Sequence, residues 1–281
     1  MKISNFSLAI GIPLTFPFVP SSFFHSFIMM DRPSFTYLHA DNGNICDLRN
    51  DLVNKAKKVG ATHLLMMDCD QVYHQETVTR LLSHKLPMVG ALVHRRYAPF
   101  DSLMLKSVEY NGQVNRYESI DDWEDNSLVK VDATGGGCLM FDMQLFHDID
   151  RLWQKEKDDF DKQAPSEGEL SLLSEQTRNY LKTLQAGYKY PHEPGVYFQS
   201  RVNVDGTPIG EDIGFCQDLQ AAGYEIFVDT SVPAGHLATL LVNTALNRLY
   251  RSVKNKQAMN QALKVDKPEN IAKDGSLIDV K

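Results

Sequence analysis

The stretch His63–Gln71, with the sequence HLLMMDCDQ, constrains the fold of this chain more than any other. Its consecutive apolar residues, Leu64–Met67, predict a short strand that is buried on both faces. Asp68 and Asp70 follow directly, where such a strand would end. In open α/β sheets ligands bind outside the carboxyl ends of the strands, and alternate residues of an extended segment point the same way. Both aspartates are therefore expected to face one ligand, with Cys69 turned into the protein; the alternative is a loop with two solvated acids.

The segments around this stretch alternate between apolar runs and helical periodicity. Strands are predicted at residues 6–12, 34–39 and 87–93, and helices at 47–59 and 75–84. This alternation predicts a parallel, doubly wound half of an α/β domain. Arg49 falls on the flank of the first helix away from Leu52, which favours a surface position. Residues 14–30, rich in phenylalanine and proline, are expected to be irregular.

The pattern changes after Tyr97. The predicted elements are a hairpin turning at Asn111-Gly112, strands at 128–131 and 138–141, and a charged helical insertion at 142–187. Gly135, Gly136 and Gly137 lie between the two strands. Successive glycines let the backbone approach a ligand closely or adopt a positive φ. Their spacing is neither a phosphate-loop nor a dinucleotide motif, so phosphate binding is not specifically indicated.

Two acids and a late histidine follow the insertion. Glu211 and Asp212 open a predicted helix at 212–222, and their alternative role is to stabilise that helix through its dipole. A strand is predicted at 224–228, with His236 in a tight loop after it. A single loop histidine is usually incidental. A further helix is expected to about residue 263, followed by a polar tail.

The composition excludes some classes of partner and location. With 29 Lys and Arg against 36 Asp and Glu, the net charge is −7, and no basic cluster exists to bind nucleic acid. The four cysteines are widely spaced without a C-x-x-C motif, so reduced thiols and a cytoplasmic location are expected. No apolar run reaches membrane-spanning length. Three prolines interrupt the apolar N-terminal segment, which argues against an export signal.

Together these segments resemble the nucleotide-sugar-dependent glycosyltransferases of the GT-A fold, of the family-two-like phage and bacterial type. The resemblance covers about residues 6–240. It is carried by ATHLLMMDCDQVYH, which holds the D-x-D motif, and by DATGGGCLMF, GEDIGFCQDLQAAGYEIFVD and PAGH. It implies an α/β fold with a Rossmann-like, mostly parallel central sheet, flanking helices and a smaller antiparallel and helical acceptor side.

The same resemblance implies a division of the chain. One catalytic domain is expected at 1–245, with a nucleotide-binding half at 1–100 and an acceptor-side half at 101–245. A C-terminal helix and polar tail are expected at 246–281. The insertion at 142–187 and the phenylalanine-rich segment 14–30 depart from the commonest family pattern. Both regions shape the acceptor or base pockets, so the resemblance does not identify the sugar, the base or the acceptor.

A metal site is the first chemical feature that the resemblance implies. Asp70 is expected to bind the metal directly and His236 to complete the site, while Asp68 contacts the ribose or reaches the metal through water. Carboxylates with one imidazole suit Mn²⁺ or Mg²⁺, and the nitrogen ligand favours Mn²⁺. The metal would bridge the two phosphates of a UDP- or GDP-linked sugar and neutralise charge on the departing nucleoside diphosphate.

The donor and acceptor pockets follow from the same resemblance. Gly135, Gly136 and Gly137 are expected to line the donor-sugar pocket. Arg49 corresponds to an arginine near the nucleotide, and the loop around Pro13 and Thr15 is expected to hold the base.

The expected reaction is transfer of a hexosyl group to a hydroxyl of a saccharide or other acceptor. Glu211-Asp212 matches the motif whose aspartate, in inverting members, removes a proton from the acceptor hydroxyl. A retaining transferase and a non-catalytic domain that binds a sugar or nucleotide are the alternatives. A nucleotidyltransferase would need a glycine-rich, basic loop after the first strand, and GIPLTFPF has none.

Overall fold

The computed structural model describes residues 6–110, 113–162, 192–202, 206, 208–238 and a few helical positions between 244 and 256. The chain divides into two compact units, Met1–Leu237 and Ala238–Lys281. Three predicted features lie outside the described residues: the hairpin turn Asn111-Gly112, the part of the insertion that follows residue 162, and the polar tail. Among the helices that the described residues form, none is both long enough and apolar enough to cross a bilayer.

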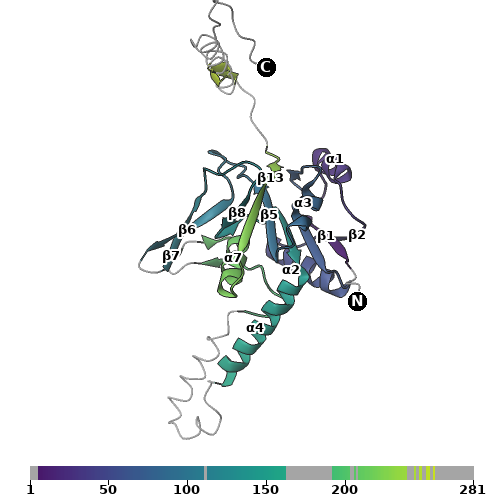
Figure 1. The fold of residues 1–281 in the computed structure, drawn as a ribbon, viewed down its shortest axis with the longest axis vertical. Coiled ribbons are helices and arrows are strands. Elements are labelled where there is room, and N and C mark those ends of the chain that lie inside the picture. Colours follow the sequence, from purple (N-terminus) through teal and green to yellow (C-terminus); the bar gives the residue numbers. More distant parts are fainter. Residues whose placement is uncertain are drawn as a thin grey trace, which may run out of the picture. The chain divides into compact units, whose positions relative to one another are not determined.

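An eight-stranded sheet forms the centre of the first unit (Figure 1). Its strands, in spatial order, are β2 (Phe35–Ala40), β1 (Leu8–Pro13), β3 (His63–Met67), β10 (Cys138–Asp142), β5 (Met88–Val93), β13 (Ile226–His236) and β4 (Gln71–Val72), and β8 (Leu128–Val131) also pairs with β13. The strands β2, β1 and β3 run parallel, as do β5 and β13, whereas β10, β4 and β8 are antiparallel to their neighbours. The predicted α/β class, with a mostly parallel central sheet and flanking helices, is confirmed.

Strand β10 interrupts the parallel order that the sequence pattern predicts. It lies between β3 and β5, with Cys138 opposite Met67 and Leu139 opposite Gly90. Since β10 runs against both neighbours, its first residue lies beside the last residue of β3. The turn of three glycines before β10 is therefore held against the two aspartates after β3.

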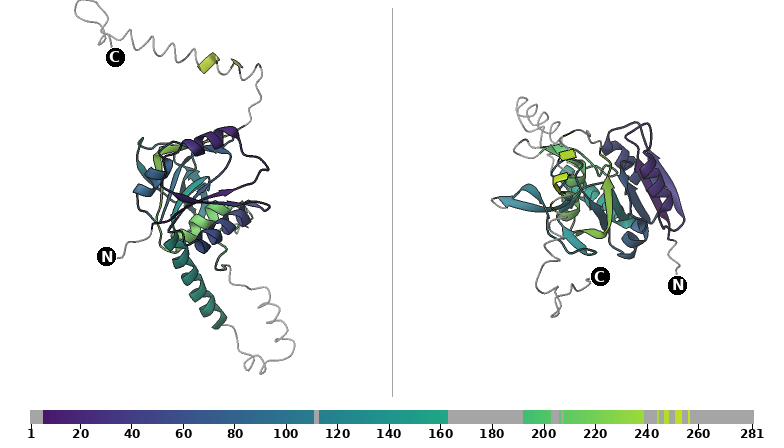
Figure 2. Two further views of the ribbon diagram at one scale, coloured as in Figure 1. Left: turned by 90° about the vertical axis from the view of Figure 1, so that its right-hand side faces the viewer. Right: turned by 90° about the horizontal axis from the view of Figure 1, so that it is seen from above.

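Helices cover both faces of the sheet. On one face α2 (Ile45–Lys58), α7 (Glu211–Ala221) and α4 (Met143–Lys162) contribute to one core cluster, and on the other α1 (Ser21–Met29) and α3 (Thr77–Ser83) contribute to a second. The left view of Figure 2 shows the purple α1 and the green α7 on opposite sides of the sheet. The expectation that 14–30 is irregular is wrong for α1, which begins directly after Pro20 and buries Phe23. Exclusion of that aromatic side chain from water stabilises the short helix.

The antiparallel part is smaller and follows β5 in the chain. A three-stranded sheet has the order β7 (Gln113–Ser119), β6 (Met104–Tyr110), β9 (Ala133–Thr134), and β11 (Arg201–Val202) pairs with β12 (Pro208–Ile209). The helical start of the predicted insertion is α4, which is 20 residues long.

The strand predicted at 224–228 begins near the expected point but ends much later. β13 continues through a register irregularity between Asp229 and Pro233 and ends at His236. The prediction of a loop histidine is therefore wrong, because the end of β13 forms a ladder with β4.

Candidate active site

The predicted site residues converge on one cavity of about 340 Å³ at the carboxyl ends of the parallel strands. All of them but Gly135 line it: Pro13, Thr15, Arg49, Asp68, Asp70, Gly136, Gly137, Glu211, Asp212 and His236. Gly135 faces Leu103 instead, whose Cδ1 would lie 2.5 Å from a Cβ added to the glycine. Residues far apart in the sequence thus meet where an open α/β sheet places its ligands.

Backbone hydrogen bonds fix the D-x-D segment to the glycine turn. The Asp68 amide donates to the Gly137 carbonyl over 2.9 Å. The Tyr73 hydroxyl donates to the carbonyls of both residues, at 2.7 Å and 2.9 Å. Burial raises the pKa of Tyr73 well above its usual value, so this hydroxyl keeps its proton and remains a donor. These contacts give the cavity floor a fixed geometry.

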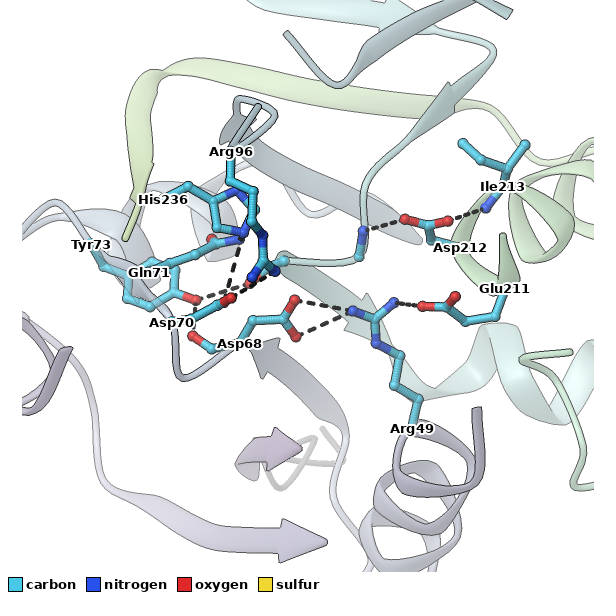
Figure 3. Close-up of polar contacts among 12 residues, drawn as sticks. Arg49, Asp68, Asp70, Gln71, Tyr73, Arg96, Glu211, Asp212, Ile213 and His236 are labelled. Carbon is cyan, nitrogen blue, oxygen red and sulfur yellow. Dashed lines mark hydrogen bonds and ion pairs between the residues drawn. The ribbon is translucent and has the colours of Figure 1, made fainter. Parts of the chain in front are cut away.

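A second backbone contact brings the late histidine to the aspartates. β4 follows Asp70 directly and pairs antiparallel with the end of β13, so that His236 lies opposite Gln71. The Leu237 amide donates to the Asp70 carbonyl over 2.8 Å. Figure 3 shows the imidazole of His236 pointing toward Asp70 and Gln71.

Arg49 lies at the centre of the ion pairs. Its Nη1 donates to Glu211 Oε1 over 2.7 Å, and its Nη2 lies 3.2 Å from each carboxylate oxygen of Asp68 (Figure 3). The guanidinium carbon also lies 5.9 Å from the centre of the Phe198 ring. Arg49 is only 3% exposed, so the surface position favoured by its spacing is wrong. Helical spacing locates the flank of α2 but does not reveal that Glu211, from α7, packs against it.

Burial and charge act against each other in this cluster. Burial raises the pKa of the Asp68 carboxyl, which Arg49 opposes and Asp70 reinforces. Burial also raises the pKa of Glu211, with Arg49 opposing and Asp212 reinforcing the shift. Burial alone would lower the pKa of Arg49, but the surrounding carboxylates together raise it. The guanidinium therefore stays charged, and the ionised acids depend on it.

Close packing explains two of the three glycines. A Cβ added at Gly136 would overlap the guanidinium of Arg49, and one added at Gly137 would overlap the side-chain amide of Gln71. Neither glycine is among those with a positive φ. The run of glycines in the sequence predicts the close approach of a ligand or a positive φ. Their immediate role is different, because they make room for two polar side chains of the protein itself.

Replacing Gly136 by alanine is expected to displace Arg49 from its ion pairs. Overpacking of this kind typically costs about 1–3 kcal/mol of unfolding free energy. Gly235→Ala is the matched control, because the nearest atom to its added Cβ is 3.9 Å away. Urea unfolding of both variants measures the difference. Equal stability of Gly136→Ala and the unmodified protein would contradict the close packing of Arg49 on this turn.

Asp212 connects α7 to the glycine turn. Its Oδ2 accepts from the Gly136 amide at 3.1 Å, and its Oδ1 accepts from the Ile213 amide at 2.8 Å. The residue at the N-cap position is Gly210, which makes no side-chain cap. Asp212 therefore does not act as an N-cap, although its charge lies in the first turn and faces the positive end of the helix dipole. A carboxylate oxygen has two lone pairs, so each can accept a further hydrogen bond from a ligand.

Asp70 and His236 fit the requirements of a metal site. His236 Nδ1 lies 2.7 Å from the His94 carbonyl oxygen, which can only accept, so this nitrogen carries the proton. In the neutral ring, Nε2 then presents its lone pair, 3.7 Å from Asp70 Oδ1. Histidine ligands of metals commonly donate their other N–H to a backbone carbonyl in this way.

The third expected metal ligand, Asp68, fits less well because both of its oxygens face Arg49. Within the described part of the chain, no group of three or more His, Cys, Asp and Glu residues is placed to hold a metal ion. Asp70 and His236 would therefore supply two ligands, and phosphate oxygens or water would supply the rest.

Two further residues of the cavity, Arg96 and Gln71, have no role predicted from the sequence. Arg96 Nη2 lies 2.8 Å from Asp70 Oδ2, and Gln71 Nε2 lies 3.5 Å from His236 Nε2. Arg96 lies just beyond the end of β5, at the sheet edge that also carries the two aspartates. Gln71 directly follows the D-x-D motif, but only its pairing across to β13 reveals its contact with the histidine.

Comparison with known proteins does not assign a family. No protein-family model matches the chain, and no curated protein matches it. The solved structure of A197 from STIV has a TM-score of 0.43 and 13% identity, covering 84% of this chain and 86% of that one. GalNAc-T7, solved with UDP, GalNAc and Mn²⁺, has a TM-score of 0.44 and 10% identity, covering 85% of this chain and 45% of that one. A structure described as a glucose-1-phosphate thymidylyltransferase from Bacillus anthracis, with sucrose, has a TM-score of 0.23 and 15% identity, covering 72% of this chain and 68% of that one.

Proposed function

We propose that this chain is a metal-dependent glycosyltransferase, which moves a sugar from a nucleoside-diphosphate sugar to a hydroxyl acceptor. The observation that carries the proposal is the arrangement of Asp70 and His236, with the carboxylate Oδ1 and the imidazole Nε2 3.7 Å apart. Four carboxylates and two arginines line the same cavity, so two negative charges lack a compensating cation. A divalent cation matches this excess and allows an anionic phosphate ligand to enter.

Donor binding is assigned to the residues at the strand ends. Asp70 and His236 would hold the cation, which when bound neutralises charge on the departing diphosphate. Pro13 and Thr15, at and just after the end of β1, line the cavity and would contact the base. Asp68 would contact the ribose while Arg49 holds its carboxylate in place.

Acceptor activation is assigned to Asp212. Glu211 is paired with Arg49, whereas no ion pair joins Asp212 to any residue that the structure describes. In the inverting reaction the acceptor oxygen bonds to the anomeric carbon, the bond from that carbon to the phosphate oxygen breaks, and Asp212 accepts the acceptor proton. A carboxylate base placed opposite the leaving group supplies this assistance.

The unmodified protein is expected to bind UDP and GDP only when Mn²⁺ is present. Asp70→Ala and His236→Ala should each abolish this Mn²⁺-dependent binding. Both side chains are only 13% exposed, so the melting temperature of each variant is measured as well, to separate loss of the site from loss of the fold. Calorimetry with and without Mn²⁺ measures the affinities, and His147→Ala is the control because His147 is exposed on α4. Tight nucleotide binding that is indifferent to Mn²⁺ and to both substitutions would refute the metal site.

A further inference from the structure

Arg96 lies at the rim of the cavity, beyond the end of β5. The segment after the strand folds back on itself, with the Arg95 amide donating to the Asp101 carbonyl over 2.9 Å. This turn places the Arg96 side chain over the cavity, where Nη2 lies 2.8 Å from Asp70 Oδ2 (Figure 3). The contact engages the carboxylate that the proposed function assigns to a metal.

The two arginines of the cavity differ in how firmly they are held. The Arg49 side chain is 4% exposed and is paired with both Asp68 and Glu211. The Arg96 side chain is 39% exposed, and its ion pair is with Asp70. Its guanidinium can therefore leave Asp70 for another anion, whereas the Asp70 carboxylate, at 13% exposure, needs another cation in its place. Of the two cavity arginines, Arg96 is thus the one whose own charge is not buried and which can change partners.

The two carboxylate oxygens of Asp70 face two different side chains. Its Oδ2 faces Arg96, and its Oδ1 faces the Nε2 of His236. A divalent cation between Asp70 and His236 would lie close to the Arg96 guanidinium and repel it. The displaced guanidinium would then face the anion that the cation brings, and its planar N–H groups match phosphate oxygens.

Gln71 supplies an independent indication of a ligand beside His236. Gln71 is 0% exposed, and its side-chain oxygen Oε1 has no hydrogen-bond partner within the described part of the chain. A buried amide oxygen without a donor is rare and costs free energy. Because the cavity wall includes Gln71, a donor from the ligand side, such as a water bound to a cation, would satisfy it.

We propose that Arg96 exchanges partners, neutralising Asp70 in the metal-free protein and binding the phosphate oxygens of the ligand once a divalent cation occupies Asp70 and His236. This inference rests on the proposed function and adds a residue that determines specificity for a diphosphate. It predicts that removing the Arg96 charge raises the affinity for the metal and lowers the affinity for the anion. A residue that merely stabilises the fold would not produce that combination.

Arg96→Met tests the exchange by calorimetry with Mn²⁺ alone and with inorganic pyrophosphate in excess Mn²⁺. Mn²⁺ alone should bind about 2- to 5-fold more tightly, because the competing ion pair is removed. Pyrophosphate should bind about 10- to 100-fold more weakly, because a charge-assisted contact is lost. Arg96→Lys should retain part of both effects of the arginine. Arg95→Met is the matched control, because Arg95 is the exposed neighbour of Arg96 in the sequence and does not line the cavity.

The outcomes separate this inference from the proposed function. If the unmodified protein binds Mn²⁺ and pyrophosphate but Arg96→Met changes neither affinity, the exchange is refuted while the metal site stands. A parallel loss of both affinities in Arg96→Met would also refute it, because Arg96 would then support the site without competing for Asp70. Failure of the unmodified protein to bind Mn²⁺ would refute both proposals.

Discussion

Replacing Arg49 by methionine is expected to lower the free energy of unfolding by about 3–5 kcal/mol, the usual cost of breaking a buried ion pair by removing one partner. Methionine fills much of the same space but leaves the carboxylates of Asp68 and Glu211 without their shared cation. Those side chains are 22% and 14% exposed, so water replaces the guanidinium only in part. Urea unfolding at neutral pH measures the loss.

Acidification should reduce this deficit. Burial raises the pKa of both Asp68 and Glu211 even with Arg49 in place. An acid whose folded pKa is raised contributes stability that is present at low pH and is lost as pH rises through that pKa. Without Arg49 both shifts grow, so the stability gap to the unmodified protein should narrow as pH falls from 7 toward about 5.

Arg116→Met is the control for loss of charge alone. Its ion pair with Glu118 is exposed, at 65% and 55%, so its removal should cost at most about 1 kcal/mol. If Arg49→Met lowers the free energy of unfolding no more than Arg116→Met does, or if this loss does not change with pH, the buried ion-pair cluster does not stabilise the protein as described.

Asp212→Asn is expected to lower the rate of sugar transfer by about 10²–10⁴-fold, the usual contribution of a general base. An amide cannot accept the acceptor proton, while donor affinity should stay unchanged because Asp212 faces the acceptor side of the proposed site. The substrate is the nucleotide sugar that a screen for Mn²⁺-dependent hydrolysis identifies, with water as the acceptor where no other is known. Nucleotide affinity is measured on the same variant.

Asp212→Asn is also expected to lower the stability of the protein. Two backbone N–H groups, from Gly136 and Ile213, point at the two oxygens of Asp212. Asparagine offers one oxygen and one NH₂ group, so one donor would meet another donor, at a cost of about 1–3 kcal/mol. Rates should therefore be compared well below the melting temperature, with Asp51→Asn as an exposed control on α2. A near-normal rate would restrict Asp212 to holding the glycine turn and favour the retaining alternative.

Much of the site could be predicted because it lies at the ends of apolar strands. Asp68, Asp70 and Arg96 each lie within three residues of the end of a buried strand, and the parallel order indicates that such ends share one edge of the sheet. Glu211 and Asp212, at the start of α7, could also be predicted, since helix N-termini have a clear sequence pattern. The α/β class follows from the same periodicity.

Other features depend on partners that periodicity does not specify. The antiparallel insertion of β10 is set by which neighbours it pairs with, and an apolar run reads the same in either direction. The burial of Arg49 depends on Glu211, 162 positions away in the sequence. The continuation of β13 to His236 depends on β4, whose two residues are too few to give a period of their own.

The late arrival of β13 has a consequence for synthesis on the ribosome. This strand lies between β5 and β4, yet it is the last strand of the first unit to be translated. Until it emerges, the nascent chain exposes the open edge of β5, which is fully buried in the finished protein. The ion pairs of Arg49 are likewise complete only after Glu211 has been translated. The proposed catalytic cavity therefore forms only near the end of translation of this unit, and an exposed hydrophobic edge of this kind is a site at which chaperones or misassembly act on incomplete chains.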